Sequence, residues 1–366
     1  MNDLKDAAYM QMAYGLAEKA IGGAGPNPYV GALVVKNDVI VGHGYHLGAG
    51  HPHAETLALM RAGARAHGAT LYVTLEPCVH WGRTPPCVDA VLTAGLKKVV
   101  VSALDPNPLV FRKGIRALRR AGLDVTVGLL AERNRRLNEC YIKYITRKIP
   151  FVTLKAALSL DGKMATKTFD SRWISAEATR EYAHLLRGEC DALLVGINTI
   201  LRDDPRLTVR HPNWPKKRIA RVVLDAGLRI PLKARILSTL PEGKIIVFAA
   251  ANAPLRKKEA LTRNGVEVIS LPARGPRLDL GRVLAKLGTQ EIASLLVEGG
   301  GQTATAFLER KLADKVLLSF SPRLIGGRDA VSFFGGAGAA GIKDALRLRT
   351  VSLFGIGEDT LLEGYF

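Results

Sequence analysis

Apolar residues recur in two alternating patterns along the first part of the chain. Between Asp6 and Ile21, alanine and leucine return at helical spacing, which predicts an amphipathic helix. Short valine-rich runs bounded by turn residues predict strands. These strands are expected over residues 30–35, 39–41, 70–75 and 97–103, and further helices over 53–66, 87–94 and 114–121. Strands that alternate with helices predict a sheet between helical layers, which is an α/β fold.

The pattern changes near residues 131–150. A charged helix is expected over 131–138, and Ile149-Pro150-Phe151 then interrupts the helical pattern before a new strand over 152–157. Proline disfavours a helical conformation at the residue before it, so we place a boundary near residue 148, between domains 1–147 and 148–366. In the second domain, helices are expected between strands near 192–196, 221–224, 244–249 and 294–297. This domain is therefore predicted to be α/β as well.

Length and composition fit two globular domains. The chain has 366 residues, of which 48% are hydrophobic and 23% are charged. This content excludes disorder as the main state. The longest apolar runs, such as 98–104, have the length of a strand and fall far short of the roughly 20 residues of a membrane span. The acidic first residues show no apolar signal segment, so we expect a cytoplasmic protein with no membrane partner.

The charge of the chain leaves two classes of ligand open. There are 52 Lys and Arg against 33 Asp and Glu, a net charge of +19. Such an excess is typical of nucleic-acid-binding proteins, and also of enzymes that handle small anionic substrates. The excess is spread over both halves of the chain and forms no basic tail, so the charge alone does not decide between these classes.

Histidine and cysteine gather in one stretch of the first half. Most histidines lie between residues 43 and 80, and His53-Ala54-Glu55 is followed by Cys78 and Cys87. One imidazole and two thiolates form a three-ligand zinc set that leaves a fourth position for water, so we expect one Zn²⁺ per chain. Zinc lowers the pKa of bound water to about 7. Glu55 is placed to take a proton from that water and pass it to a leaving amine, as the glutamate of zinc deaminases does.

This zinc motif resembles a known superfamily. His53-Ala54-Glu55 with Pro77-Cys78 is similar to the cytidine-deaminase superfamily, but eight residues separate the cysteines where base-editing deaminases carry P-C-x-x-C. Segment 78–87, CVHWGRTPPC, closely resembles the deaminase half of the bifunctional riboflavin-biosynthesis deaminase/reductase, and segments 26–31, 41–46 and 105–108 agree with it. The resemblance implies a cytidine-deaminase-like α/β/α sandwich for the N-terminal domain.

The same resemblance implies contacts for a pyrimidine substrate that bears a ribosylamino phosphate. Asn27 would hold the pyrimidine, and the ribose phosphate end would meet His46, His80 and Arg83. One position departs from the family pattern, because Arg112 stands where a glycine is usual. Glycine reaches positive φ at little cost and arginine does not, so the backbone conformation of this loop could differ from that of the family.

The second half carries a weaker motif of its own. Residues 295–303, LLVEGGGQT, run from an apolar strand into a glycine-rich turn, and a helix is expected over 303–311. Backbone N–H groups at a helix start suit a phosphate, although this is not the G-x-G-x-x-G of Rossmann folds. Segments 155–163, 171–175, 198–210 and 297–300 are similar to the reductase half of the same family. The resemblance implies a dihydrofolate-reductase-like α/β domain that uses NADPH.

The resemblance divides the residues of this second domain into two groups. The cofactor would contact Ala157, Trp173, Thr199, Asp203, Gly299, Gly300, Gly301, Gln302, Thr303 and Ala304. The substrate would contact Lys155, Ser171, Arg187, Leu207, Arg210 and Glu298. Arginine suits a substrate phosphate. Lys155 or Glu298 would carry the proton that accompanies hydride transfer, and the sequence leaves open which of them does so.

Together these features predict a bifunctional enzyme. Zinc-dependent hydrolytic deamination of 2,5-diamino-6-(5-phosphoribosylamino)pyrimidin-4-one would precede NADPH-dependent reduction of the ribosyl group of 5-amino-6-(5-phosphoribosylamino)uracil. A nucleic-acid-editing deaminase is an alternative that the net charge raises. The long segment between the cysteines speaks against it, and we expect no nucleic-acid partner. A third alternative makes the C-terminal half a non-catalytic binding or dimerisation module. The resemblance implies a homodimer or homotetramer.

Overall fold

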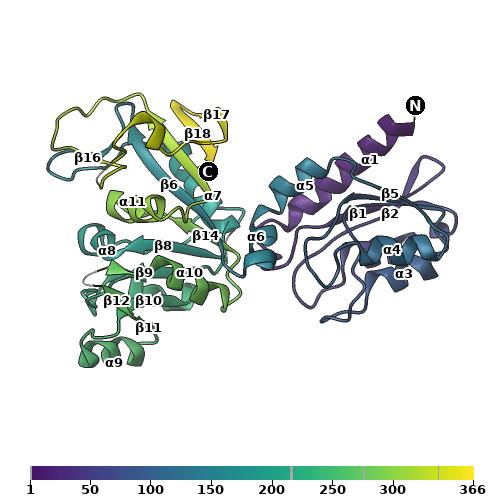
Figure 1. The fold of residues 1–366 in the computed structure, drawn as a ribbon, viewed down its shortest axis with the longest axis horizontal. Helices are drawn as coiled ribbons and strands as arrows, with labels where there is room; N and C mark the ends of the chain where they lie inside the picture. The colour runs from purple at the N-terminus through teal and green to yellow at the C-terminus, as the bar shows by residue number, and fades with distance from the viewer. Residues whose placement is uncertain (1, 215–216, 275–276, 337) are drawn as a thin grey trace. The chain divides into compact units, whose positions relative to one another are not determined.

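The computed structural model describes residues 2–214, 217–274, 277–336 and 338–366. Contacts between Cα atoms divide the chain into two units, Met1–Lys148 and Ile149–Phe366, which are treated separately below (Figure 1). Among the described helices, none combines the length and the apolar character that crossing a membrane requires.

The first unit is built on a five-stranded sheet with the strand order β2-β1-β3-β4-β5. Strand β1 is antiparallel to both β2 and β3, whereas β3, β4 and β5 are parallel. The bounds are β1 (Gly31–Lys36), β2 (Val39–Tyr45), β3 (Thr70–Leu75), β4 (Lys98–Ala103) and β5 (Asp124–Val127).

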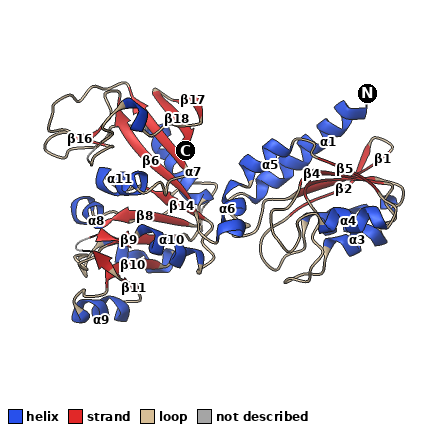
Figure 2. Ribbon diagram, in the orientation of Figure 1, coloured by secondary structure: helices blue, strands red, loops and turns tan. Residues whose placement is uncertain are grey.

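Helices cover both faces of this sheet (Figure 2). They are α1 (Asn2–Ala17), α2 (Ala54–Ala62), α3 (Cys87–Thr93), α4 (Lys113–Arg120), α5 (Ala131–Leu137) and α6 (Glu139–Arg147), with 3-10 turns at Glu18–Ala20 and Gly63–Ala66. Side chains alternate along each strand, so Leu33 and Val35 pack with α1 while Ala32 and Val34 pack with α2, α3 and α4. The result is a three-layer α/β/α sandwich.

The second unit is built on a nine-stranded sheet with the order β11-β10-β9-β8-β14-β6-β15-β18-β17. The strands from β11 to β15 are parallel, and β18 and β17 continue the sheet in antiparallel pairing. The bounds are β6 (Phe151–Ser159), β8 (Ala192–Gly196), β9 (Ala220–Leu224), β10 (Ile245–Ala250), β11 (Glu267–Leu271), β14 (Ser294–Val297), β15 (Lys315–Ser321), β17 (Thr350–Ile356) and β18 (Asp359–Tyr365).

A separate hydrophobic cluster covers each face of this larger sheet. One contains apolar side chains of α10 and α11, and the other contains side chains of α8 and α9. The helices are α7 (Glu177–Glu189), α8 (Ile197–Asp203), α9 (Leu255–Arg263), α10 (Leu280–Gly288) and α11 (Gly301–Glu309), with 3-10 turns at Arg235–Glu242 and Ile342–Asp344. Short ladders join β7 (Lys163–Ala165) to β16 (Val331–Ser332) and β12 (Ala273–Arg274) to β13 (Arg277–Leu278).

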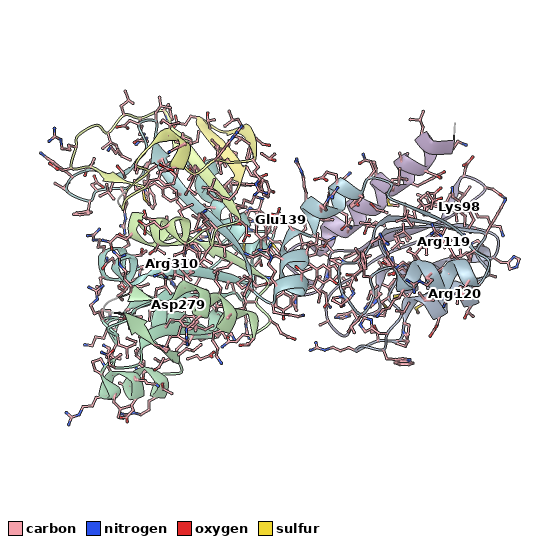
Figure 3. The ribbon with its side chains drawn as sticks, viewed as in Figure 1. Lys98, Arg119, Arg120, Glu139, Asp279 and Arg310 are labelled. Atoms are coloured by element: carbon pink, nitrogen blue, oxygen red, sulfur yellow. The ribbon has the colours of Figure 1, made fainter. Side chains whose placement is uncertain are left out.

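Three side-chain contacts hold helices in place, and Lys98, Asp279 and Arg310, which make them, are labelled in Figure 3. The Asp279 carboxylate accepts hydrogen bonds from the N–H groups of Gly281 and Arg282 and so caps α10. Arg310, which follows α11, donates to the carbonyl oxygen of Leu278 at 3.1 Å. In the first unit, Lys98 Nζ lies 2.8 Å from the carboxylate of Asp6 and ties α1 to the start of β4.

Most of the expected elements are present, with shifted ends. The helix expected over 6–21 begins at Asn2 and ends at Ala17. The pattern did not predict β5, α6, β11, β15, β17 or β18. Strand β17 leaves nearly all its side chains exposed, so no buried face gives it an alternating signal. Strand β15 owes its place to pairing with β6, which lies far away in sequence.

Candidate active sites

The metal-ligand candidates come from three separate places in the first unit. His53 directly precedes α2, Cys78 follows β3, and Cys87 is the first residue of α3. Their ligand atoms all lie within 4.8 Å of one another. His53 Nδ1 lies 3.0 Å from Cys87 Sγ and 3.5 Å from Cys78 Sγ. One imidazole nitrogen and two sulfurs that converge in this way are a donor set that fits zinc with one position left open.

The ionisation of this cluster favours a bound cation. Hydrogen bonds from the Cys87 thiol and from His53 lower the pKa of Cys78, whereas the bond to Cys78 and burial raise the pKa of Cys87. Two thiolates therefore need a further positive charge. Glu55, which is only 4% exposed, lies in the first turn of α2, and burial raises its pKa to about 7. A carboxyl group that titrates near neutrality can both accept and release a proton.

Thr84 is a neighbour of this cluster that the sequence did not single out. Its Oγ1 lies 3.2 Å from His53 Nε2. A metal-binding histidine typically donates its second ring N–H to an oxygen, which fixes the tautomer and leaves the other nitrogen for the metal. Thr84 therefore favours presentation of Nδ1 by His53. It lies within the segment between the two cysteines, but no spacing rule marks it.

Glu76 organises the loop next to the metal cluster. Its carboxylate accepts hydrogen bonds from the N–H groups of Asp105, Arg112 and Ile115 at 3.0–3.3 Å. Arg112 is left-handed, with φ 60° and ψ −4°, so the backbone retains the conformation that a glycine would adopt at little cost. A Cβ on Gly114 would lie 2.1 Å from the carbonyl oxygen of Pro77, which explains the glycine at that position.

The candidate contacts for the deaminase substrate separate into an inner and an outer group. Asn27 Nδ2 and His46 Nε2 lie 3.0 Å apart, and the ring of His46 packs edge-on against His53. His46 is only 3% exposed, and burial together with His53 lowers its pKa. A neutral, buried imidazole suits orientation of the Asn27 amide better than phosphate binding. His80 is half-buried and Arg83 is exposed, both on the loop that leads to Cys87.

In the second unit, the structure brings Arg187, Glu298 and Lys155 into one charged cluster. Arg187 donates two hydrogen bonds to the carboxylate of Glu298, from Nε to Oε1 at 3.0 Å and from Nη2 to Oε2 at 2.5 Å. Burial opposes the charge of Glu298, but Arg187 and Lys155 outweigh it and lower its pKa to about 2. Burial lowers the pKa of Lys155, and Glu298 opposes that shift. Glu298 thus stays ionised, and Lys155 is the group whose proton is more easily released.

The other candidate substrate contacts lie on two loops, one between α8 and β9 and one before α7. Arg210 is exposed, and its Nη2 lies 3.1 Å from His184 Nε2, a neighbour the sequence did not single out. Leu207 is 4% exposed and belongs to the core, so only its backbone is available to a ligand. Ser171 is exposed at the start of the segment that contains Trp173.

Most of the candidate cofactor residues lie on, or follow directly after, parallel strands of the large sheet. Ala157 lies on β6, and Thr199 and Asp203 lie on α8. The side chain of Trp173 is 61% exposed, and the guanidinium of Arg180 stacks on its ring. Residues 299–304 form the turn after β14 and the start of α11. A Cβ on Gly299 would lie 2.6 Å from Thr303 Cβ, and one on Gly301 would lie 2.6 Å from the carbonyl oxygen of Ser332.

Space remains in front of this glycine turn. A Cβ on Gly300 would meet nothing within 4 Å, and the N–H groups of Gly301 and Gln302 have no acceptor within the described part of the chain. Free N–H groups at a helix start that faces open space suit an anion. These residues therefore fit the phosphates of a dinucleotide.

Comparison with known proteins assigns both units. The family model described as the zinc-binding region of cytidine and deoxycytidylate deaminases matches residues 4–103, and the RibD C-terminal domain matches residues 150–362. Riboflavin biosynthesis protein RibD of Aquifex aeolicus is 45% identical over 98% of this chain and 97% of its own length. The Escherichia coli protein of the same name is 37% identical over 98% of this chain and 99% of its own length.

Solved structures agree with these matches. Acinetobacter baumannii RibD superposes with a TM-score of 0.87 at 36% identity and covers 99% of both chains. A diaminohydroxyphosphoribosylaminopyrimidine deaminase/5-amino-6-(5-phosphoribosylamino)uracil reductase from Thermotoga maritima gives the same TM-score at 34% identity, over 100% of this chain and 99% of its own.

The fold, the metal cluster and these matches define a zinc-type pyrimidine deaminase joined to a reductase on one chain. The chain belongs to the RibD family of riboflavin-biosynthesis enzymes. The predicted α/β folds, cytidine-deaminase-like and dihydrofolate-reductase-like, and the use of zinc and NADPH are confirmed at the level of the family. A nucleic-acid-editing deaminase is not favoured, and the reductase match removes the support for a non-catalytic C-terminal half.

Proposed function

We propose that residues 1–147 carry the deaminase reaction and residues 148–366 the reduction. The substrate of the first is 2,5-diamino-6-(5-phosphoribosylamino)pyrimidin-4-one, and the second reduces the ribosyl group of 5-amino-6-(5-phosphoribosylamino)uracil. Convergence of His53, Cys78 and Cys87 around one point beside the buried Glu55 is the observation that carries the proposal.

In the deaminase, His53, Cys78 and Cys87 hold the zinc ion. Bound zinc supplies a water whose pKa falls to about 7. Glu55, buried beside the three ligand residues, accepts a proton from the attacking water and delivers a proton to the leaving amine nitrogen. Asn27, held by His46, orients the pyrimidine ring, while His80 and Arg83 meet the ribose phosphate end. Arginine matches a phosphate with its planar donor fork.

In the reductase, the charged cluster orients the opened sugar. The pair of Arg187 and Glu298 presents a fixed carboxylate to sugar hydroxyls, with Ser171 and the backbone of Leu207 beside it. Arg210 meets the substrate phosphate, because no carboxylate pairs with it in the described part of the chain. Lys155, rather than Glu298, which is ionised at neutral pH, delivers the proton.

NADPH supplies the hydride when bound. Gly299, Gly300, Gly301, Gln302, Thr303 and Ala304 hold its phosphates, and Ala157, Trp173, Thr199 and Asp203 line the rest of its site. The chain's own contribution is to align donor and acceptor carbons and to keep water away from them.

We also propose a cytoplasmic homodimer or homotetramer formed through the second unit. Strand β17 ends the nine-stranded sheet, and its outer edge pairs with no other strand of the described chain. Val351, Leu353 and Phe354 on this strand are 50%, 66% and 37% exposed. An exposed apolar edge strand is normally covered. Light scattering tests the assembly, and a purely monomeric protein would contradict it.

The central test separates the two activities with one substitution. Glu55→Gln removes the proton carrier and keeps its size, so deamination of the diaminopyrimidine is expected to fall about 10²- to 10⁴-fold. Zinc content and NADPH oxidation with the deaminated uracil as substrate stay unchanged. Ammonia release, metal analysis and nicotinamide absorbance measure these three quantities. Deamination at the wild-type rate would remove Glu55 from the reaction, and simultaneous loss of reduction would argue against two separate sites.

A further inference from the structure

Arg229 lies at the same edge of the sheet as the candidate cofactor residues. It follows β9, which pairs with β8, and β8 in turn pairs with β14. These strands are parallel, so the loop after β9, the start of α8 and the start of α11 leave the sheet at one edge. Neither motif matching nor resemblance singled out this arginine.

A chain of two hydrogen bonds joins Arg229 to the start of α11. Arg229 Nη2 donates to Asn198 Oδ1 at 3.0 Å, and Asn198 Nδ2 donates to Gln302 Oε1 at 3.3 Å. Each amide therefore has a defined orientation. Asn198 is the second residue of α8, and Gln302 is the second residue of α11. The guanidinium is thus held in a fixed relation to the helix start that we propose binds the cofactor diphosphate.

Arg229 is also a free cation in a region where other arginines are engaged. Its side chain is exposed, and no carboxylate pairs with it within the described residues. By contrast, Arg202 of α8 stacks on the ring of Phe169 at 3.9 Å, and Arg206 pairs with Glu242 at 3.3 Å. Arg229 therefore has donors left for an anionic ligand.

We propose that Arg229 is the residue that selects NADPH over NADH, by binding the 2′-phosphate of the cofactor. The inference rests on the proposed reductase site. NADPH differs from NADH by one phosphate monoester, which carries a charge of about −1.5 to −2. The N–H groups of the α11 start serve the diphosphate, which both nucleotides share, and cannot distinguish them. A cation held beside that helix start can do so, because its planar fork matches a terminal phosphate.

Binding measurements on the free enzyme test this without catalysis. Dissociation constants for NADPH and NADH are measured by the fluorescence of the reduced nicotinamide, for the wild type and for Arg229→Gln. A charged hydrogen bond is lost only with NADPH, so NADPH affinity falls about tenfold to a hundredfold while NADH affinity stays unchanged. Arg229→Lys, which keeps the charge but loses the fork, recovers part of the loss. Arg256→Gln, which removes another exposed charge, on α9, leaves both constants unchanged.

The outcomes distinguish this inference from the proposed function. Equal weakening of both nucleotides would overturn it, because Arg229 would then contact a part that both share. Unchanged binding of both nucleotides would overturn it as well. If the wild type bound neither nucleotide, this result would contradict the proposed cofactor site, and the inference that depends on it would be contradicted as well. Because Arg229 is exposed, its substitution is expected to leave the unfolding midpoint unchanged, and circular dichroism checks this.

Discussion

The cluster around His53 and the cluster around Glu298 both gather ionisable side chains in poorly exposed positions, but they balance charge differently. In the first, Cys78, Cys87 and Glu55 are all potential anions, and His53 is the only cationic side chain that contacts the thiols within the described residues. In the second, Arg187 and Lys155 already face Glu298. The deaminase centre therefore needs an added cation to be complete, whereas the carboxylate of the reductase centre is already compensated by cationic side chains of the chain itself.

Removal of zinc is the strongest way to test this difference. A chelator is expected to abolish deamination and to destabilise the first unit, by about 4 kcal/mol relative to zinc at 1,000 times its dissociation constant. The second unit is expected to keep its stability and its NADPH oxidation, because none of its charges depends on the metal. Calorimetry with and without zinc, combined with hydrogen exchange in each unit, measures the effect. An equal loss of protection from hydrogen exchange in the second unit would contradict the idea that only the first unit depends on the metal.

Removal of one partner of the ion pair in the second unit is expected to have the next largest effect, a loss of stability of that unit. Arg187→Met leaves Glu298 poorly compensated, and side-chain exposures of 15% and 11% mean that water cannot replace the partner fully. Loss of one partner of a buried pair costs about 3–5 kcal/mol. Denaturant unfolding followed in the second unit measures this. The double variant Arg187→Met/Glu298→Leu is the control, and it should recover most of the loss. A cost below 1 kcal/mol for the single variant would place the pair among weak surface pairs.

The same pair predicts an acid-sensitive stability of the second unit. The pKa of Glu298 falls from 4.5 to about 2 on folding. Its contribution, about 3 kcal/mol, is fully present above pH 4.5 and is lost as the pH falls through 2. Unfolding free energies of wild type and Glu298→Gln between pH 6 and pH 2 measure this, and the difference between them should shrink as the pH falls. A difference that is constant with pH would show that packing, not ionisation, dominates.

The smallest predicted effect concerns the loop beside the metal cluster. Arg112 is held at φ 60°, where a side chain costs about 1 kcal/mol relative to glycine. Arg112→Gly is expected to stabilise the first unit by up to about 1 kcal/mol and to keep the N–H bond to Glu76. Arg116→Gly removes the same side chain from an ordinary helical position of α4 and should destabilise by about 1 kcal/mol. Thermal unfolding compares the two, and equal effects would exclude relief of backbone strain.

Local patterns predicted the first site more fully than the second. His53, Glu55, Cys78 and Cys87 are marked by residue type and spacing, because few chemistries need that combination. The pairing of Arg187 with Glu298 joins residues 111 positions apart and has no local signal. The same holds for Thr84 beside His53 and for Arg229 beside Asn198, since each contact depends on how two loops meet.

The alternation of strands and helices, the candidate zinc ligands and the glycine turn before α11 could be predicted from the chain, because they depend on the order of neighbouring residues. The pairing of charges, and with it the choice of groups that can move a proton, emerged from the three-dimensional fold alone. Glu298 and Lys155 were equal candidates in the sequence. The positive charges of Arg187 and Lys155 hold Glu298 as a carboxylate against the effect of burial, whereas burial makes Lys155 the easier proton donor, since a pKa depends on the surroundings of a group in space.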